Sequence, residues 1–169
     1  MIYRLLSPSY DSAVAELVRS NLKAHQLDIP GTVYFDDNLY HLSEFYNAMP
    51  GKRIYYVLTD ESDNVLGGVG LAEFAGIEDC AELQKLYLND SVKGRGLSYD
   101  LMNKVESVAR DLGYKRMYLE THENLKAAIH LYEKCGYKEI KRPKAVVHST
   151  MNRFFLKELE TERESGEEV

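Results

Sequence analysis

Apolar residues recur with a helical period in three stretches of the chain, which are therefore expected to form amphipathic helices. They cover Asp11 to Leu22, Leu97 to Leu112 and residues 125–135. Ser9 or Asp11 is the candidate cap of the first helix. Gly113 and Gly136 follow the other two directly, and a glycine in that position favours a helix stop. A shorter helix is expected over Leu39 to Ala48.

Six other segments are rich in β-forming residues and are expected to be strands. They are residues 53–59, 65–74, 81–88, 116–121, 137–142 and 149–159. The sequence DESDN between the first two predicts a hairpin loop. Gly67, Gly68 and Gly70 are unusual inside a strand, and they predict close packing or a bulge there.

From residue 81 onward the predicted elements alternate strand, helix, strand, helix, strand. This order implies a right-handed crossover and some parallel pairing, whereas the hairpin before it implies antiparallel pairing. We therefore expect an α/β fold, with helices on the faces of a mixed sheet. A length of 169 residues without a Gly/Ser linker favours a single domain over residues 1–159. Residues 160–169 hold five Glu and one Arg without apolar periodicity, which predicts an acidic, disordered tail.

Composition narrows the classes of function. No apolar run approaches the ~20 residues that span a bilayer, and the first residues are too polar for a signal peptide. Cys80 and Cys135 match no metal spacing, so buried free thiols in a reducing, cytoplasmic setting and no metal are expected. The net charge of -6 argues against general nucleic-acid binding, but it is compatible with a cationic amine substrate.

The stretch VKGRGLSYDLM, residues 92–102, places two glycines and two cations directly before a predicted helix. A surface turn is the simplest interpretation. The alternative is an anion site, because a helix start presents unpaired N–H groups and partial positive charge, and glycines let the backbone approach the anion. The pattern is neither a Walker loop nor the dinucleotide fingerprint, because it lacks the Gly-Lys-Ser/Thr of one and the third glycine of the other.

Two motifs together resemble the GNAT acyltransferase superfamily: KGRGLS at 93–98 and LYEKCGY at 131–137. The resemblance covers residues 53–159 well and the first 50 only by pattern, and it is greatest to small bacterial N-acetyltransferases of undefined substrate. Lys93 stands where Arg or Gln is usual, and Ser98 replaces a final Gly or Ala. The family's Asn before the last helix is also missing, because Leu125 occupies that place and Asn124 lies one position off.

The resemblance implies a mostly antiparallel sheet of about six to seven strands flanked by about four helices. It also implies acetyl-CoA as co-substrate. The residues that it assigns to acetyl-CoA binding are Leu86, Tyr87, Leu88, Lys93, Gly94, Arg95, Gly96, Leu97 and Ser98. In the family the central strand has a bulge, which frees a backbone N–H to bind the oxyanion. The resemblance places this bulge near Leu86 to Leu88. Tyr132 falls on the tyrosine that protonates the leaving thiolate, although a core tyrosine is the simpler alternative.

Glu82 is the candidate general base, because an alkyl ammonium must lose a proton before it can attack a thioester. Some histone-modifying members of the superfamily carry their catalytic Glu at the same place. An exposed strand carboxylate is the alternative interpretation. Tyr34, Tyr40 and His148 are candidate acceptor contacts, although each is equally compatible with a structural role.

These motifs predict an N-acetyltransferase that acts by direct attack in a ternary complex, on a small-molecule or peptide amine. Neither nucleic acid nor a membrane is an expected partner, and the resemblance is compatible with a homodimer. Two alternatives remain: a non-catalytic domain that binds acyl-CoA as a sensor or docking unit, and a regulatory protein that binds another diphosphate.

Overall fold

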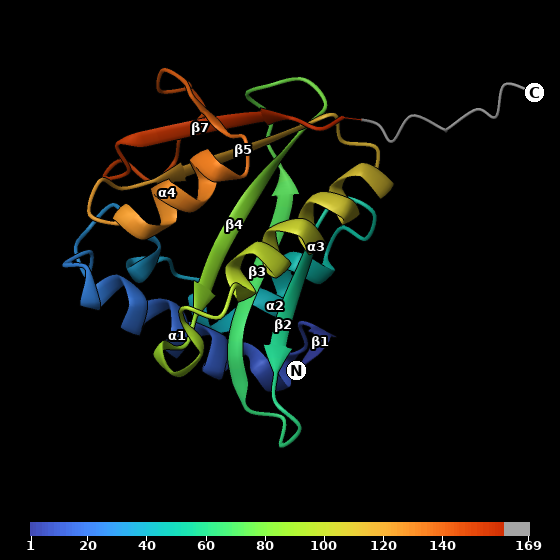
Figure 1. Ribbon diagram of the computed structural model, residues 1–169, viewed down its shortest axis with the longest axis vertical. Helices are drawn as coiled ribbons and strands as arrows, with labels where there is room; N and C mark the ends of the chain where they lie inside the picture. Colours follow the sequence, from blue (N-terminus) through green and yellow to red (C-terminus); the bar gives the residue numbers. More distant parts are fainter. Residues whose placement is uncertain (161–169) are drawn as a thin grey trace, which may run out of the picture.

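The computed structural model describes residues 1–160 and contains one seven-stranded mixed sheet (Figure 1). The strands lie in the order β1-β2-β3-β4-β5-β7-β6. Their bounds are β1 Ile2–Leu5, β2 Ile54–Thr59, β3 Val65–Glu73, β4 Cys80–Leu88, β5 Arg116–Thr121, β6 Lys138–Glu139 and β7 Arg153–Glu158. All neighbours are antiparallel except β4 and β5. The predicted α/β class and the predicted number of strands are confirmed.

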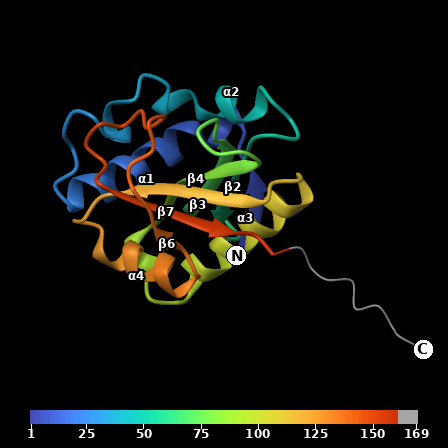
Figure 2. The same cartoon turned by 90° about the horizontal axis from the view of Figure 1, so that it is seen from above.

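Four α-helices cover the two faces of the sheet: α1 Asp11–Ala24, α2 Leu42–Asn47, α3 Leu97–Asp111 and α4 Lys126–Lys134. Helices α1 and α2 lie on one face and α3 and α4 on the other (Figure 2). Each face has its own buried apolar cluster. Val14, Val18 and Tyr46 belong to the first, and Leu101 and Tyr132 belong to the second.

The two parallel strands separate soon after they begin. β4 and β5 pair only from Cys80 to Glu82 on one strand and from Arg116 to Tyr118 on the other. Beyond this point β4 turns away from β5, as the widening gap between them in Figure 1 shows. The backbone groups that face the gap therefore have no partner strand, although β4 stays paired with β3 and β5 with β7, and the cavity described below lies in this gap.

A β-bulge interrupts β4 in the middle of this separation. Gly68 is opposite Tyr87, whereas Gly70 is opposite Gln84, so β4 has one residue more than β3 in this interval. Lys85 occupies the bulge with a φ of 50°, a backbone conformation that few residues other than glycine adopt. The bulge lies at Lys85, directly before the stretch Leu86 to Leu88 where it was expected.

The glycines of β3 make room for two tyrosines that support this bulge. A Cβ at Gly68 would lie 2.5 Å from the hydroxyl of Tyr55, and one at Gly70 would lie 2.5 Å from its ring. The Tyr55 hydroxyl donates to the Lys85 carbonyl at 2.9 Å. Tyr46, whose ring lies 3.0 Å from the Gly70 Cβ position, donates to the side chain of Gln84 at 2.7 Å. The glycines therefore serve close packing. One bulge lies on the neighbouring strand β4, and β3 has its own register shift against β2 at Leu66, directly before Gly67.

Four local expectations differ from the structure. The chain begins with β1, which the hydrophobic pattern did not indicate, and β6 is only two residues long. The segment before α2 is a separate 3-10 turn, Leu39–His41. Neither predicted cap forms: the residue before α1 is Tyr10 and makes no side-chain cap. Asp11 instead accepts hydrogen bonds from the backbone and hydroxyl of Ser43, which ties α1 to α2. The predicted acidic tail lies outside the described residues, except for Glu160.

Candidate active site

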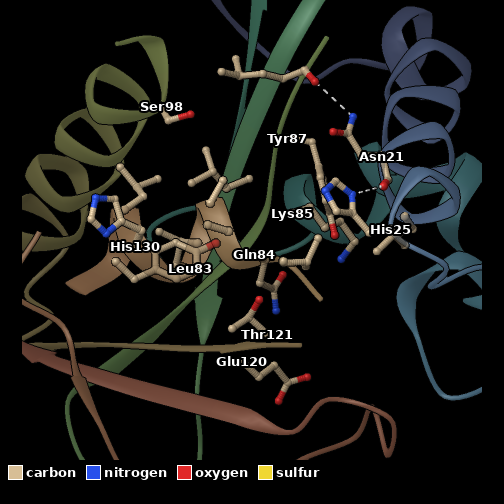
Figure 3. Close-up of a pocket in the computed structure, with 18 of the residues that line it drawn as sticks. Asn21, His25, Leu83, Gln84, Lys85, Tyr87, Ser98, Glu120, Thr121 and His130 are labelled. Carbon is tan, nitrogen blue, oxygen red and sulfur yellow. Dashed lines mark hydrogen bonds between the residues drawn. The ribbon is translucent and has the colours of Figure 1, made fainter. Parts of the chain in front are cut away.

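A cavity of about 520 Å³ occupies the space where β4 and β5 separate (Figure 3). It extends from the glycine loop at the start of α3 to the carboxylates of Glu82 and Glu120, which lie where β4 and β5 begin to separate. Ser98 on α3 and His130 on α4 lie on one side of the view, and Asn21 on α1 and His25 directly after α1 lie on the other (Figure 3). The cavity therefore passes through the sheet and is open to residues from both of its faces.

The glycine loop forms one end of the cavity. Gly94 and Gly96 have φ values of 78° and 76°, and Gly96 is the residue directly before α3. A Cβ at either position would meet no atom within 4 Å, so space lies open above the loop. Unpaired N–H groups of the first turn of α3 face this end with the positive pole of the helix. This arrangement fits a pyrophosphate, which the sequence motif predicted for the same residues.

The predicted cofactor-binding residues meet at this cavity, with one difference. Leu86 to Leu88, Lys93, Gly94 and residues 96–98 all line it, whereas Arg95 does not. Lys93 is held to one side: its ammonium contacts Asp90 at 2.7 Å and the side-chain oxygen of Asn21 at 3.0 Å.

Asn21 links the loop to the open part of β4. Its amide nitrogen donates to the carbonyl of Leu88 at 3.1 Å, while its amide oxygen accepts from Lys93. This side chain is buried and comes from α1, more than 60 residues away in the chain. It therefore fixes the end of β4 relative to the loop that follows.

Glu82 is the last residue of β4 that pairs with β5, and it lies at the other end of the cavity from the glycine loop. Glu120 lies on β5 two residues beyond Tyr118, the partner of Glu82, so the two carboxylates line the same space. Burial, with the neighbouring charge of Glu120, raises the pKa of Glu82 to about 7. Glu82 is therefore a much stronger base than an ordinary surface carboxylate, and it is poised to exchange a proton near neutral pH.

His148 connects two distant carboxylates beside this pair. Its Nδ1 lies 3.0 Å from Glu120, and its Nε2 lies 3.0 Å from both oxygens of Asp36. Ionised carboxylates only accept hydrogen bonds, so both ring nitrogens must donate and the ring is an imidazolium. The hydrogen bonds to Asp36 and Glu120 accordingly raise the pKa of His148 to about 9. The predicted candidate His148 thus lines the cavity as a cation.

Tyr132 lines the cavity from α4. Its ring packs near Tyr137 and Phe155, with centroids 6.1 and 6.3 Å away. Its hydroxyl has no hydrogen-bond partner among residues 1–160, yet it is not sealed from the cavity. Burial raises the pKa of this hydroxyl above its usual range, so it remains protonated and can donate a hydrogen bond.

The other two acceptor candidates lie elsewhere. Tyr40 is on the surface, where its hydroxyl bonds Glu16 and Arg19, and the Arg19 guanidinium lies over the ring of Tyr34. Neither Tyr34 nor Tyr40 lines the cavity, although Val33 beside them does.

Several cavity residues escaped the sequence analysis. They are Asn21, His25, Gln84, Lys85, Glu120 and His130, together with Asp36, which reaches the site through His148. A weak signal existed for Glu120 and Lys85, since each is one of only two charged residues in its strand. Nothing local marks Asn21 or Asp36, whose partners are far away in the chain.

Two structural findings bear on other classes of function. Within the part of the chain that the structure describes, no helix has the length and apolar character needed to cross a membrane. No group of three or more His, Cys, Asp or Glu among residues 1–160 is arranged to hold a metal ion. Cys80 is a buried free thiol as expected, whereas Cys135 is partly exposed.

Comparisons with known proteins agree with this geometry. The family model described as the acetyltransferase (GNAT) family matches residues 14–137. The uncharacterized N-acetyltransferase YjgM of Escherichia coli (strain K12) is 37% identical over 141 residues, which are 82% of this chain and 83% of that protein. The crystal structure of a GNAT-family acetyltransferase from Staphylococcus aureus Mu50 matches with a TM-score of 0.83 at 20% identity, over 94% of this chain and 99% of its own.

A further structural neighbour was solved with ligands. The spermidine N-acetyltransferase of Vibrio cholerae, in complex with CoA and spermine, matches with a TM-score of 0.68 at 20% identity, over 94% of this chain and 95% of its own. At this identity the likeness concerns the fold alone. The family model covers most of the chain, the Escherichia coli relative matches over a similar extent, and the separated strands and glycine loop are in place. This chain therefore belongs to the GNAT family of acetyltransferases.

Proposed function

We propose that this protein transfers the acetyl group of acetyl-CoA to a primary amine of a small molecule or peptide, by direct attack within a ternary complex. The observation that carries the proposal is the continuous cavity. At one end it has the open glycine loop at the start of α3, and at the other it has Glu82, a carboxylate with a pKa of about 7. A diphosphate site and a base thus share one passage through the sheet.

Glu82 acts as the base. An alkyl ammonium has a pKa near ~10.4 and cannot attack while it is protonated. The ionised Glu82 accepts that proton, directly or through water, and the nitrogen lone pair then forms the bond to the thioester carbonyl carbon. As the carbon–sulfur bond breaks, the electron pair passes to the sulfur. The nitrogen then loses its second proton, which reaches the thiolate through water, so that the products are the amide and the thiol of CoA. The raised pKa supports this role, because the carboxylate binds the proton more tightly than an ordinary one would.

Tyr132 and the bulge of β4 stabilise the charges that develop. The free hydroxyl of Tyr132 donates to the sulfur as it becomes negative. Its raised pKa favours a hydrogen bond over early proton loss, so the thiolate is stabilised before it is protonated. The backbone N–H groups next to Lys85 are displaced from the regular ladder, and they are the candidates that donate to the carbonyl oxygen.

Direct attack is favoured over a covalent acetyl-enzyme. The thiol nearest to Glu82 is Cys80, which is 3% exposed. Burial raises the pKa of Cys80 to about 12, so very little nucleophilic thiolate forms near neutral pH. Cys80 also does not line the cavity.

Two measurements test the proposal together. Calorimetric titration with acetyl-CoA, CoA and ATP should show binding of the first two, and a thiol-release assay over amino acids, polyamines, aminoglycosides and peptides should show turnover. Gly96→Val should weaken acetyl-CoA binding strongly without unfolding the protein, because its φ of 76° disfavours a β-branched residue and the side chain would occupy the open space. Binding of acetyl-CoA without release of thiol for any amine would indicate a sensor. Tighter binding of ATP than of CoA would indicate a different diphosphate ligand.

A further inference from the structure

The bulge in β4 determines where the side chain of Lys85 points. In a regular strand, Gln84 and Lys85 would face opposite sides of the sheet. Here both approach Tyr46: the Gln84 side chain accepts from its hydroxyl, and the Lys85 ammonium lies 5.8 Å from its ring centroid. Lys85 accordingly lies on the side of Asn21 and His25, across the cavity from Ser98 and His130 (Figure 3). This is the α1 and α2 side of the sheet, opposite α3 and α4 (Figure 2).

Lys85 is a cation without a carboxylate partner. Lys93, also in the cavity, contacts Asp90, and the imidazolium of His148 contacts Asp36 and Glu120. Lys85 forms no ion pair and no side-chain hydrogen bond with any residue in the described range 1–160. Lys85 is half-buried, and burial lowers the pKa of its ammonium against the opposing effect of the charges of Asp36, Glu82 and Glu120.

An unpaired cation in such a place is unfavourable for folding, because its desolvation is not offset by a close counter-charge. The charges of Asp36, Glu82 and Glu120 favour the ammonium, but none of these carboxylates lies within ion-pair distance of it. Asp36 and Glu120 are already hydrogen-bonded to His148, and Glu82 stays beyond ion-pair distance. An anion bound in the cavity would supply the missing partner. The proposed pyrophosphate site is not beside Lys85, because Ser98 in the first turn of α3 lies across the cavity from it (Figure 3).

Glu82 and Lys85 stand three positions apart on one strand, or roughly 10 Å between backbone positions. Gln84 and Lys85 face the α1 side, and Glu82 shares the side of Gln84 by strand alternation. A molecule that presents its amine to Glu82 is therefore within reach of the long Lys85 side chain. A carboxylate a few bonds from the amine would meet the ammonium, whereas a second ammonium would be repelled.

We propose that Lys85 binds a carboxylate of the acceptor, so that the preferred acceptors are amino acids rather than polyamines. This proposal rests on the proposed function, because it concerns the acceptor of the same reaction. It assigns Lys85 to substrate recognition and leaves the chemical steps to Glu82 and Tyr132.

The experiment compares matched acceptors. Amino acids, their primary amides and the corresponding decarboxylated amines are assayed by thiol release, with spermidine as the polycationic arm. The wild-type protein should prefer the acids. Lys85→Met keeps the length of the side chain and removes its charge. It should lower the ratio of kcat/KM for acid over amide by about 10–100-fold, the effect of one charge-assisted hydrogen bond. Because the ratio is compared between two proteins, the different amine pKa values of acid and amide cancel.

Lys134→Met is the matched control, since Lys134 is exposed on α4 outside the cavity and should leave the ratio unchanged. Lys85→Met should melt at or above the wild-type temperature, because it removes a half-buried charge that has no ion-pair partner among residues 1–160. Equal or better turnover of the amides or of spermidine by the wild type would overturn the inference and leave the acetyltransferase proposal intact. An unchanged ratio in Lys85→Met would also overturn it. No turnover with any amine would defeat the proposed function and this inference together.

Discussion

At the scale of the residue, the proton affinity of Glu82 depends on the side chains around it. The pKa of Glu82 is raised to about 7 by burial and by the charge of Glu120, whose carboxylate lies 3.0 Å from Nδ1 of His148. Both glutamates line one cavity, so a change at Glu120 should be felt at Glu82.

Replacing Glu82 by Gln should therefore lower kcat/KM by about 10²–10⁴ near pH 7, the usual contribution of a general base. The loss should shrink at high pH, where free amine accumulates in solution. Steady-state kinetics between pH 6 and 10 on an accepted amine measures both effects. A profile equal to that of the wild type at every pH would remove Glu82 from the reaction.

The effect of the neighbouring charges on the pKa of Glu82 can be tested by the direction of the shift that each charge causes. In the wild type the acid limb of kcat/KM should fall near pH 7, since the base must be ionised. The charged groups that face Glu82 are Glu120 on β5, Lys85 on β4 and His148 before β7. Glu120 raises the pKa of Glu82, whereas Lys85 and His148 lower it.

Glu120→Gln should thus move the limb to lower pH, and His148→Gln should move it to higher pH. Shifts in the same direction for both variants would contradict this electrostatic account. Acetyl-CoA affinity, measured on each variant, controls for disturbance of the other end of the cavity.

Tyr132→Phe should lower kcat and kcat/KM together by about 10–10³-fold and leave acetyl-CoA affinity nearly unchanged. The ring keeps its packing against Tyr137 and Phe155, and only a hydroxyl without a hydrogen-bond partner among residues 1–160 is lost. Kinetics and calorimetry on the same preparation separate the two quantities. If kcat is unchanged, Tyr132 is a packing residue.

At the scale of elements, the sequence was most informative where one period persists. The periodic apolar residues gave α1, α3 and α4 to within about two residues, and both glycine stops have positive φ at Gly113 and Gly136. The hydrophobic pattern did not predict β1, because three of its four residues have more than a third of their surface exposed and so show no alternation of buried and exposed positions. The order β5-β7-β6 also has no local sequence signal, because it depends on long-range pairing.

The residues of the candidate site also fall into two groups: those in contiguous motifs and those joined only by long-range contacts. The glycine loop and Tyr132 belong to contiguous motifs and could be read from the sequence. The contacts of His148 with Asp36 and Glu120 span 112 and 28 positions, and no local pattern encodes them. The side on which Lys85 points depends on a bulge, which hydrophobic alternation cannot reveal.

The support of this bulge by β3 can be tested with Gly70→Ala. The added methyl group would lie 2.5 Å from the ring of Tyr55 and 3.0 Å from that of Tyr46, and both rings are about 1% exposed. We expect a loss of stability of about 1–3 kcal/mol in urea unfolding, as for other overpacked cores. Activity should fall further than the unfolded fraction explains, because Tyr55 holds the Lys85 carbonyl.

Tyr55→Phe is the companion variant. It removes the hydrogen bond to that carbonyl without adding volume, and it should lower kcat with a stability loss of only about 1 kcal/mol. Full activity in both variants would show that the bulge does not depend on Tyr55.

At the scale of the whole molecule, His148 ties the segment after residue 35 to the segment before β7 through Asp36. The pKa of His148 is raised from 6.5 to about 9 in the folded protein. A group with a raised pKa stabilises the fold fully below its unfolded value and loses this effect as the pH rises through its folded value. The contribution, about 1–3 kcal/mol after solvent screening, should therefore be present at pH 6.5 and fade toward pH 9.

Urea unfolding at pH 6.5, 7.5 and 9 compares the wild type with His148→Gln. The difference in unfolding free energy between the two proteins should narrow as the pH rises. A constant difference over this range would mean that the tie does not depend on the charge of the imidazole. The comparison of two proteins removes the effects of other groups that titrate in the same range.

The strand order also has a consequence for how the molecule assembles. β2, β3 and β4 are neighbours in the sheet in chain order, so the contacts among them close short loops, whereas β1 reaches β2 across the long segment that contains α1 and α2. β6 pairs only with β7, and β7 must enter between β5 and β6. During synthesis the first half can therefore gain its hydrogen bonds early, whereas the second half waits for residues 153–158. Until then the segment that carries His148 is not anchored by β7. The glycine loop can therefore form on the growing chain before the proposed amine pocket is complete.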